Sequence, residues 1–354
     1  MRIIDRYLGG AVVVGTLVTL GVLLPLLGFF VLADEMEAAG VDGYGFGGAM
    51  TFMLLSLPGY AYQLFPIATL IGALVGLGTL ASRSELVALR AAGVSVAQIV
   101  RAAMLGGVLL ALLAVVLGEV LAPLAEQRGA ELRREALSGE VAQQTADGFW
   151  AVDDGAYVNI REIRSGTSLS DISIFQVDTT AGTLVSTHAD GARYVDDGWV
   201  LQGIARSRVR PDGVEVERIA QARWDSMLDP GLLKVVVAEP QALPVWGLYK
   251  YIRFMRVNGQ DAGAYEVAFW GKVLHPVLTL SMIFVAIPIL LGSARSSGMG
   301  RRIFAGVLIG ILYYLISRTL AYLALLFGLS PLLAALAPPL LFSAGAMVLL
   351  RRVG

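Results

Sequence analysis

Six long apolar stretches constrain this sequence more than any other feature. A helix needs roughly 20 mostly apolar residues to cross the hydrocarbon core of a bilayer, and glycine and proline are tolerated in such helices. The stretches that meet this requirement are Leu8–Leu32, Leu57–Leu80, Ile99–Leu121, Val267–Leu291, Ile303–Phe327 and Pro331–Leu350. Hydrophobic residues make up 56% of the chain and charged residues only 16%, so the apolar excess requires a non-aqueous solvent. The sequence therefore predicts a polytopic α-helical membrane protein with six transmembrane helices.

The positions of the arginines predict how these helices are oriented. Arginine occurs at both termini and in the loops after the second and fourth stretches, whereas loops 33–56 and 328–330 contain no lysine or arginine. Because basic residues in short loops mark the cytoplasmic side, we expect both termini in the cytoplasm. The long insert, residues 122–266, is then expected on the outer side, between transmembrane segments 1–121 and 267–354.

The insert has the sequence pattern of an all-β domain. Short alternating runs occur between Gly148 and Asp229, and the turn signals between them are Asp154-Gly155, Ser165-Gly166, Ala181-Gly182, Asp197-Gly198 and Pro211-Asp212-Gly213. This spacing predicts seven to nine antiparallel strands within about 145–230, in a sandwich or open barrel. The large aromatics Trp150, Trp199 and Trp224 are expected in its core.

Helical connectors are expected on both sides of the strands. The first covers residues 123–138 and is rich in charge. The second covers 245–257, and its aromatic residues suit a helix that lies at the membrane interface.

A short helix is predicted in the basic loop between the second and third stretches. Ser84 can cap its N-terminus, Glu85 suits the positive end of the helix dipole, and Gly93 is a typical residue for its C-terminal stop. This helix either docks in a groove of a cytoplasmic partner or is a capped connector on the membrane surface. Its candidate functional residues are Ser84, Glu85, Leu86, Leu89, Arg90 and Gly93.

Ionisable residues inside the apolar stretches are candidates for function because they are costly there. Arg318 could face a cavity that binds an anionic substrate, or it could snorkel or form a salt bridge. Arg128, Arg133 and Arg134 could extend the same basic collar, or they could form a solvated helix face. The remaining intramembrane candidates, Glu119, Lys272 and His275, make no recognised catalytic constellation.

Several classes of function are excluded or disfavoured. The chain has no cysteine and only two histidines, which lie far apart, so we expect no metal site and no bound cofactor. It has no phosphate-binding Gly-x-x-x-x-Gly-Lys-Ser/Thr loop and therefore cannot be an ATPase by itself. A net charge of −1 gives no indication of nucleic-acid binding. The motifs Gly72–Gly76 and Gly306–Gly310 allow close helix packing, either within one bundle or between two chains.

The chain resembles the LptF/LptG family of permease subunits from lipopolysaccharide-export ABC transporters. Arg83–Gly93 is the most specific stretch, and Gly259–Gly263 inclines the resemblance to the LptG branch. The other residues that carry it are Ile4-Asp5-Arg6-Tyr7-Leu8, Pro66, Gly72-Ala-Leu-Val-Gly-Leu-Gly78, Gly118-Glu119 with Pro123, and Trp270.

The resemblance implies a non-catalytic permease in the inner membrane of a Gram-negative bacterium, with a periplasmic β-jellyroll and lipopolysaccharide as its cargo. It implies three partners: an LptF-like sister permease, an LptB-like ATPase homodimer that uses ATP and Mg, and an LptC-like bridge protein with one span. The first and fifth spans of opposite permeases would form lateral gates, and 84–93 would be the coupling helix. The residues expected at the substrate cavity are Arg133, Arg134, Arg128, Arg318, Phe65, Leu308, Leu312 and Tyr314.

One departure from the family concerns the end of the first span. Some members carry lysines there, whereas this chain has the acidic stretch Val31–Glu37. We therefore expect arginines elsewhere to meet the anionic groups of the substrate. A membrane-anchored sensor, a membrane enzyme acting on lipid, and a permease for another lipid or lipoprotein are the alternative functions.

Overall fold

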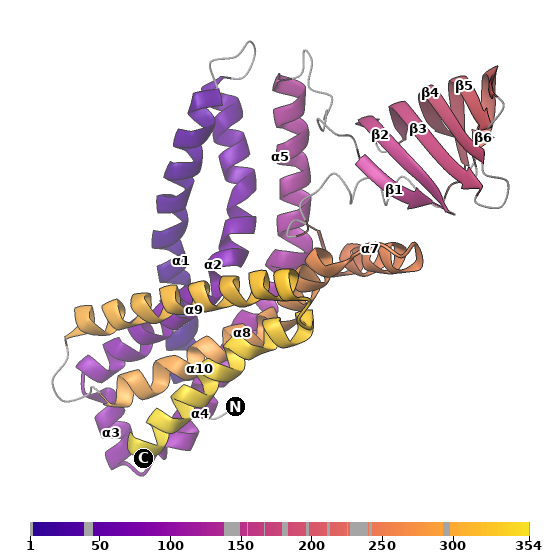
Figure 1. The fold of residues 1–354 in the computed structure, drawn as a ribbon. Coiled ribbons are helices and arrows are strands. Elements are labelled where there is room, and N and C mark those ends of the chain that lie inside the picture. The colour runs from indigo at the N-terminus through magenta and orange to yellow at the C-terminus, as the bar shows by residue number, and fades with distance from the viewer. Residues whose placement is uncertain are drawn as a thin grey trace. The chain divides into compact units, whose positions relative to one another are not determined.

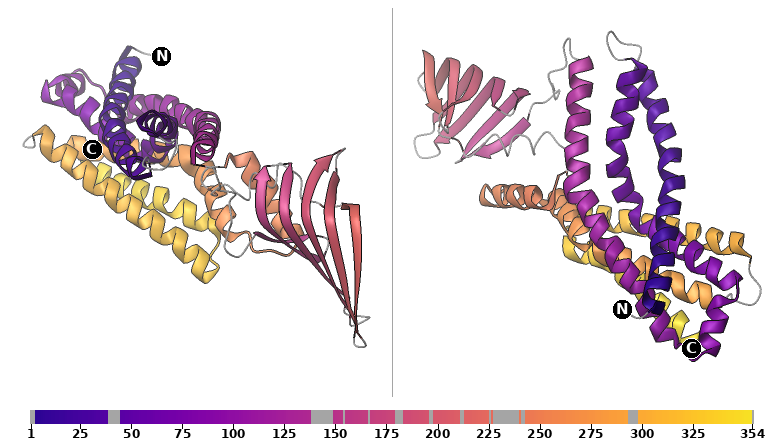
Figure 2. Two further views of the ribbon diagram at one scale, coloured as in Figure 1. Left: turned by 90° about the horizontal axis from the view of Figure 1, so that it is seen from above. Right: turned by 180° about the vertical axis from the view of Figure 1, so that it is seen from behind.

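The computed structural model (Figures 1 and 2) consists of two compact units. Residues 1–133 and 263–354 form the first, and residues 134–262 form the second. The structure describes residues 3–38, 45–137, 149–153, 155–165, 167–178, 183–195, 198–210, 213–224, 226, 240, 243–292 and 298–353.

The first unit contains the six predicted membrane helices. All six apolar stretches lie within helices that are long and apolar enough to cross a bilayer, which confirms the prediction of a polytopic helical protein. The helices are α1 (Ile3–Ala38), α2 (Phe46–Ser82), α3 (Glu85–Ala91), α4 (Val96–Val116), the π-helix η1 (Leu117–Leu121), α5 (Ala122–Leu137), α8 (Gly263–Gly292), α9 (Met299–Phe327) and α10 (Pro331–Val353).

The third span does not end where its apolar stretch ends. Helices α4, η1 and α5 follow one another without a break, and the continuous helix runs to Arg133 within the first unit. Pro123 explains the π-helix in the middle: it lacks an N–H group, and its ring would clash with the carbonyl four residues earlier. The N–H of Ala122 accordingly donates to the carbonyl of Leu117, five residues back. The boundary between the units therefore falls inside α5 and not at residue 122.

Helix α2 is the centre of the first unit. It packs against α1, α8 and α9, while α4 packs against α1 and α8, and α10 packs against α8 and α9. In the apolar membrane-spanning stretch of α2, 67% of the residues are buried, compared with 22% in α1 and 11% in α9. The first and fifth spans thus have the largest surfaces available to lipid or to another chain.

Glycines let α1 approach α2 until the two backbones touch. A Cβ atom on Gly15 would overlap the carbonyl of Gly72, one on Gly72 would overlap the backbone of Thr16, and one on Gly76 would overlap the carbonyl of Ala11. Close backbone approach through small residues is a main way in which helices associate where no hydrophobic force acts between them. The Gly72–Gly76 motif therefore packs two helices of this chain against each other.

The second small-residue motif is also used inside the bundle. A Cβ atom on Gly306 would lie 2.6 Å from Cδ1 of Leu74, and one on Gly310 would lie 3.0 Å from Cγ2 of Ile67. Both glycines are buried and hold α9 on α2. The alternative that these motifs form a dimer interface is not supported.

The second unit contains an antiparallel sheet of six described strands that pair in chain order, β1 to β6. They are β1 (Phe149–Asp153), β2 (Ala156–Ser165), β3 (Ser168–Asp178), β4 (Thr183–Val195), β5 (Gly198–Arg210) and β6 (Gly213–Trp224). The inserted β domain is confirmed, and a predicted turn signal follows each of β1 to β5. Within the described residues there are six strands and not seven to nine. Their order is that of a meander, without the crossing connections of a jellyroll.

A line of residues that are skipped in the strand pairing crosses the middle of the sheet. The pairing of β3 with β4 skips Asp171 and Asp190, and the pairing of β4 with β5 skips Asp190 and Gly203. Asp171 and Gly203 have positive φ angles of 52° and 64°. One residue is skipped on each strand, so the register is the same on both sides of this line.

The tryptophans of the sheet differ in their burial. Trp199 is fully buried, as predicted, and packs edge-to-face against Tyr194. Trp150 is 51% exposed and stacks on Phe175, so the prediction that it lies in the core was wrong. Trp224 is only partly buried.

Helix α7 (Val245–Val257) follows the sheet in the chain and matches the predicted connector. Its end is well defined: the amide of Gln260 donates to the carbonyl of Met255, and Gly259 has a φ of 67°. A glycine in the left-handed region is the usual C-terminal stop of a helix.

The contact of α1 with α2 gives a test of the fold. We expect Gly72→Ala to destabilise the protein by about 1–3 kcal/mol, because its Cβ meets backbone atoms that cannot rotate away. Thermal unfolding in detergent measures this effect. Gly21→Ala on α1 is the matched control, since a Cβ there meets nothing within 4 Å. Equal melting temperatures for the two variants would contradict the packing described here.

Candidate functional site: an apolar groove with a charged rim

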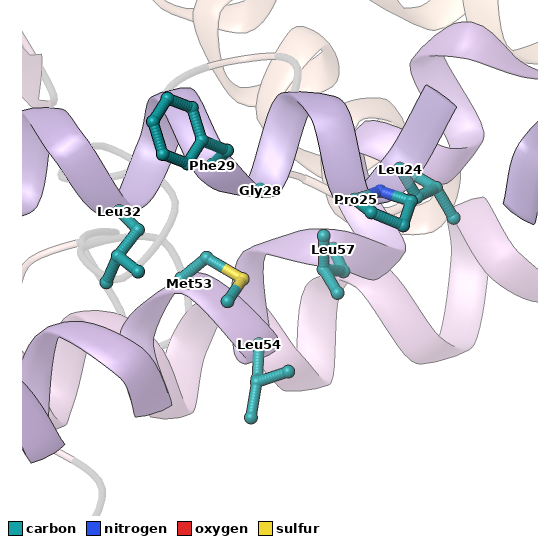
Figure 3. A pocket seen from close by; sticks show the side chains of 8 residues that line it. All are labelled: Leu24, Pro25, Gly28, Phe29, Leu32, Met53, Leu54 and Leu57. Carbon is teal, nitrogen blue, oxygen red and sulfur yellow. The ribbon is translucent and has the colours of Figure 1, made fainter. Parts of the chain in front are cut away.

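An apolar groove of about 380 Å³ lies between the C-terminal half of α1 and the N-terminal part of α2 (Figure 3). Gly28 has no side chain, and an added Cβ would lie 3.1 Å from Sδ of Met53 on the opposite wall. All eight lining residues are apolar: Leu24, Pro25, Gly28, Phe29, Leu32, Met53, Leu54 and Leu57. Such a lining suits a hydrocarbon chain and offers nothing to a polar ligand.

A charge pair lies next to this groove. Glu35 is one helical turn beyond Leu32 on α1, and its carboxylate lies 2.9 Å from Nε of Arg133 on α5. The guanidinium of Arg133 also lies 5.4 Å from the ring centroid of Phe52, the neighbour of the groove residue Met53. We call Glu35, Arg133 and Phe52 the rim. The apolar groove and the rim together form an amphipathic site.

The two members of the charge pair differ in their exposure. The side chain of Glu35 is 7% exposed and that of Arg133 is 46% exposed. Arg133 can therefore meet a second anionic partner while Glu35 cannot. The acidic stretch at the end of the first span thus acts on the predicted basic residue directly, a pairing that sequence reasoning missed.

The other predicted basic residues are placed less specifically. Arg318 is exposed on α9, its Nε donates to the hydroxyl of Tyr314 at 3.3 Å, and its guanidinium lies over the Tyr314 ring. Among the described residues Arg318 forms no ion pair, so the salt-bridge alternative is not observed. Arg128 is exposed on α5, and the side chain of Arg134 lies outside the described residues.

The predicted apolar wall residues fall into two groups. Leu308 and Leu312 are each 51% exposed on α9, opposite the face that carries Gly306 and Gly310. Phe65 is fully buried in the core of the bundle. Its side chain has no surface for an acyl chain, and the expectation that it lines a cavity was wrong.

The structure brings together Glu119, Lys272 and His275, for which the sequence gave no constellation. Nζ of Lys272 lies 3.7 Å from Glu119 and 3.3 Å from the carbonyl of Gly118. His275 stacks on Tyr62 with ring centroids 4.0 Å apart, and its Nε2 lies 3.1 Å from the Tyr62 carbonyl. We call these five residues the polar joint, because it connects α2, η1 and α8.

The need for the polar joint follows from Pro123. In a regular helix the Gly118 carbonyl would accept from Ala122, whose N–H donates to Leu117 here. The next possible donor, Pro123, has no N–H. A carbonyl without a donor is costly in hydrocarbon, and Lys272 supplies the donor. The groups that could act as acid and base are thus engaged in holding helices together.

The short helix α3 covers most of the predicted 84–93 segment. Leu86 is buried and Leu89 half-buried against the bundle core, and Glu85 accepts a hydrogen bond from the hydroxyl of Tyr7 on α1. Val87 and Arg90 point away and are exposed. Leu86 and Leu89, two of the candidate residues for a partner contact, therefore attach α3 to its own chain.

The predicted C-terminal stop of α3 is present, whereas the predicted N-terminal cap is not. Gly93 has a φ of 91°, and its amide donates to the carbonyl of Arg90 while that of Val94 donates to Leu89. This is the predicted glycine stop, in the Schellman form. Ser84 occupies the N-cap position with a φ of 60° but makes no capping hydrogen bond, so its predicted capping role was wrong.

Two further contacts near α3 were missed by sequence reasoning. Ser95 and Gln98 form a complete capping box at the start of α4, which the Ser-x-x-Gln spacing could have indicated. Arg101 on α4 donates to both carboxylate oxygens of Asp5 on α1, at 3.0 and 3.2 Å. Sequence alone has no signal for this long-range pair.

Comparison with known proteins gives a family and several relatives. The family described as lipopolysaccharide export system permease LptF/LptG matches residues 6–352. The chain is 33% identical to the lipopolysaccharide export system permease protein LptG of Haemophilus influenzae, over 96% of this chain and 95% of that protein. It is 32% identical to the LptG protein of Escherichia coli K12, over 99% of this chain and 98% of that protein. These relatives agree with the LptG branch that Gly259–Gly263 indicated.

The polar joint can be tested by stability. We expect Lys272→Met to cost about 1–3 kcal/mol, because the Gly118 carbonyl and the Glu119 carboxylate both lose their cationic donor. Thermal unfolding of the purified chain measures the loss. Val273→Met introduces the same side chain one position further along, where the native residue is 39% exposed, and should change little. The joint would be unsupported if both variants melted alike.

Proposed function

Because this chain belongs to the LptF/LptG family of lipopolysaccharide export permeases, we propose that it is the permease subunit of an ATP-driven transporter. This transporter extracts lipopolysaccharide from the inner membrane of a Gram-negative bacterium and passes it to a periplasmic bridge. The chain supplies a wall of the substrate path and no bond-breaking residue. The similarity to LptG proteins over nearly the whole length of both chains supports this proposal.

The observation that carries the proposal is the apolar groove beside the rim. Lipopolysaccharide has acyl chains attached to a phosphorylated headgroup, so a site that binds it needs an apolar surface and a cation side by side. The groove between Leu24 and Leu57 removes acyl chains from water. Arg133 offers the fork of N–H donors that matches phosphate geometry.

Partner subunits complete the site. The exposed surfaces of α1 and α9 fit a lateral gate against an LptF-like sister permease, and Leu308, Leu312, Tyr314 and Arg318 lie on the exposed side of α9. An LptC-like protein with one span continues the bridge from the β domain. The arginines of the short loops support a topology with the termini and α3 in the cytoplasm and the rim and the β domain in the periplasm.

ATP hydrolysis by an LptB-like ATPase homodimer, which binds ATP and Mg, supplies the energy for transport. The exposed side of α3, with Val87 and Arg90, is the surface that this ATPase contacts. Glu85 links α3 to α1 through Tyr7, and α1 carries five of the eight groove-lining residues at its other end. A movement of α3 is therefore transmitted along one helix to the substrate site.

The charge pair of the rim regulates access to Arg133 within this mechanism. In the structure Arg133 is paired with Glu35, so a phosphate group must compete with a carboxylate for the same guanidinium. Because the Arg133 side chain is 46% exposed, a phosphate group can reach its guanidinium from the exposed side. Headgroup binding thus replaces one anionic partner of Arg133 with another, and release restores the original pair.

The substrate site can be tested by crosslinking lipopolysaccharide to the groove in the assembled transporter. We expect Arg133→Gln to reduce the crosslinking yield severalfold, and Glu35→Gln to raise it, because the neutral amide no longer competes for Arg133. Arg128→Gln, one to two turns earlier on the same helix, is the control and should have a smaller effect. Unchanged yields in both rim variants would remove the charge pair from the site.

The coupling surface can be tested by co-purification of the ATPase and by transport in reconstituted vesicles. We expect Arg90→Glu to weaken ATPase association, whereas Arg351→Glu, another exposed arginine on the same side, should not. Tyr7→Phe removes only the hydrogen bond to Glu85. It should leave association intact and lower transport per ATP hydrolysed. The assignment of α3 fails if Arg90→Glu retains both association and transport.

A further inference from the structure

The exposed side of α7 has an unusual composition that the proposed transport function does not use. The helix has two faces: Leu248, Tyr251, Ile252 and Phe254 are buried, and the opposite stripe is exposed. The exposed stripe consists of Trp246, Tyr249, Lys250, Arg253, Arg256 and Val257. It contains three basic residues, two large aromatic residues and no acidic residue.

The stripe follows from the helical repeat. Positions 246, 249, 250, 253, 256 and 257 are three or four residues apart and therefore share one side of the helix. Trp246 and Tyr249 are 64% and 59% exposed, an unusual placement for large aromatics in water. Nζ of Lys250 lies 5.4 Å from the Trp246 ring centroid, so the cationic and aromatic groups are adjacent.

The sequence places α7 close to a membrane span. Only residues 258–262 separate it from α8, which is long and apolar enough to cross a bilayer. Five residues extend at most roughly 18 Å at about 3.3–3.6 Å each. Covalent connection alone therefore keeps the C-terminal end of α7 near the level at which α8 leaves the hydrocarbon.

We propose that the exposed stripe of α7 lies on the lipid surface of the membrane and binds the phosphate groups of anionic phospholipids. Tryptophan and tyrosine favour the interface because one end of each side chain is apolar and the other polar. Lysine and arginine beside them are attracted to anionic headgroups. The absence of any acidic residue from this stripe removes the repulsion that would oppose such binding.

A lipid surface fits the stripe better than a protein partner does. The two aromatic residues come first in the stripe, and the three cations follow at Lys250, Arg253 and Arg256, toward the end that leads into α8. The basic charge therefore lies at the end of α7 nearest the membrane span, where anionic headgroups attract it. This binding would hold the start of α8 and the second unit at the membrane surface independently of substrate. The inference concerns the membrane and does not depend on the identity of the transported molecule.

The first experiment measures whether the stripe touches lipid. The chain contains no cysteine, so Tyr249→Cys gives it a single site for an environment-sensitive fluorophore. The full chain is reconstituted without partners into nanodiscs of phosphatidylcholine that contain brominated lipid as the quencher. These nanodiscs are prepared once with and once without phosphatidylglycerol. We expect quenching of the label by brominated lipid to increase about twofold when phosphatidylglycerol is present. Val216→Cys, 59% exposed on β6, is the control and should show no such quenching.

The second experiment tests the charges. Arg253→Glu combined with Arg256→Glu in the Tyr249→Cys chain should abolish the dependence on phosphatidylglycerol, whereas Arg218→Glu on β6 should preserve it. A label at position 249 that stays water-exposed in every lipid overturns the proposal. The same holds if the label is shielded only after partner subunits are added, which would assign the stripe to a protein partner. Equal behaviour of the two charge variants also overturns it.

Discussion

The backbone contact between α1 and α2 is the interaction on which the rest of the first unit depends. Gly15, Gly72 and Gly76 allow the two helices to touch where any side chain would force them apart. Lipid chains are as apolar as leucine, so close packing must replace the hydrophobic force that holds soluble helices together. The groove, the rim and the attachment of α3 all include residues of α1, so the position of each depends on this contact.

Polar groups inside the bundle act mainly as connectors. Lys272 supplies a donor to the carbonyl that Pro123 leaves without one, and Ser281 on α8 lies 2.8 Å from Ser343 on α10. The hydrocarbon core offers no water to satisfy such groups. The same requirement that makes an intramembrane charge expensive makes it an effective link when it has a partner. This explains why Glu119, Lys272 and His275 gather without forming a catalytic arrangement.

Sequence patterns predicted the elements well where a single physical requirement decides them. The six spans follow from apolar length, the breaks between strands from glycine-containing turns, and the end of α3 from Gly93. Strand β4 contains Asp190-Gly191, a dipeptide typical of turns, yet it continues through the sheet, and Asp190 is skipped in the pairing beside Asp171 and Gly203. Pairing with both neighbouring strands, and not the dipeptide, decides that the strand continues there.

The sequence by itself determined that the chain crosses a membrane six times, which loops carry the positive charge, and that a β domain is inserted after the third span. These properties depend on whether each segment requires water or hydrocarbon around it, and the composition of the segment indicates this directly. Only the tertiary structure decided that Phe65, Leu86 and Leu89 face inward and that Glu35 pairs with Arg133 across distant helices. Those outcomes depend on which face each helix presents to its neighbours. That choice is made by packing between segments far apart in the chain.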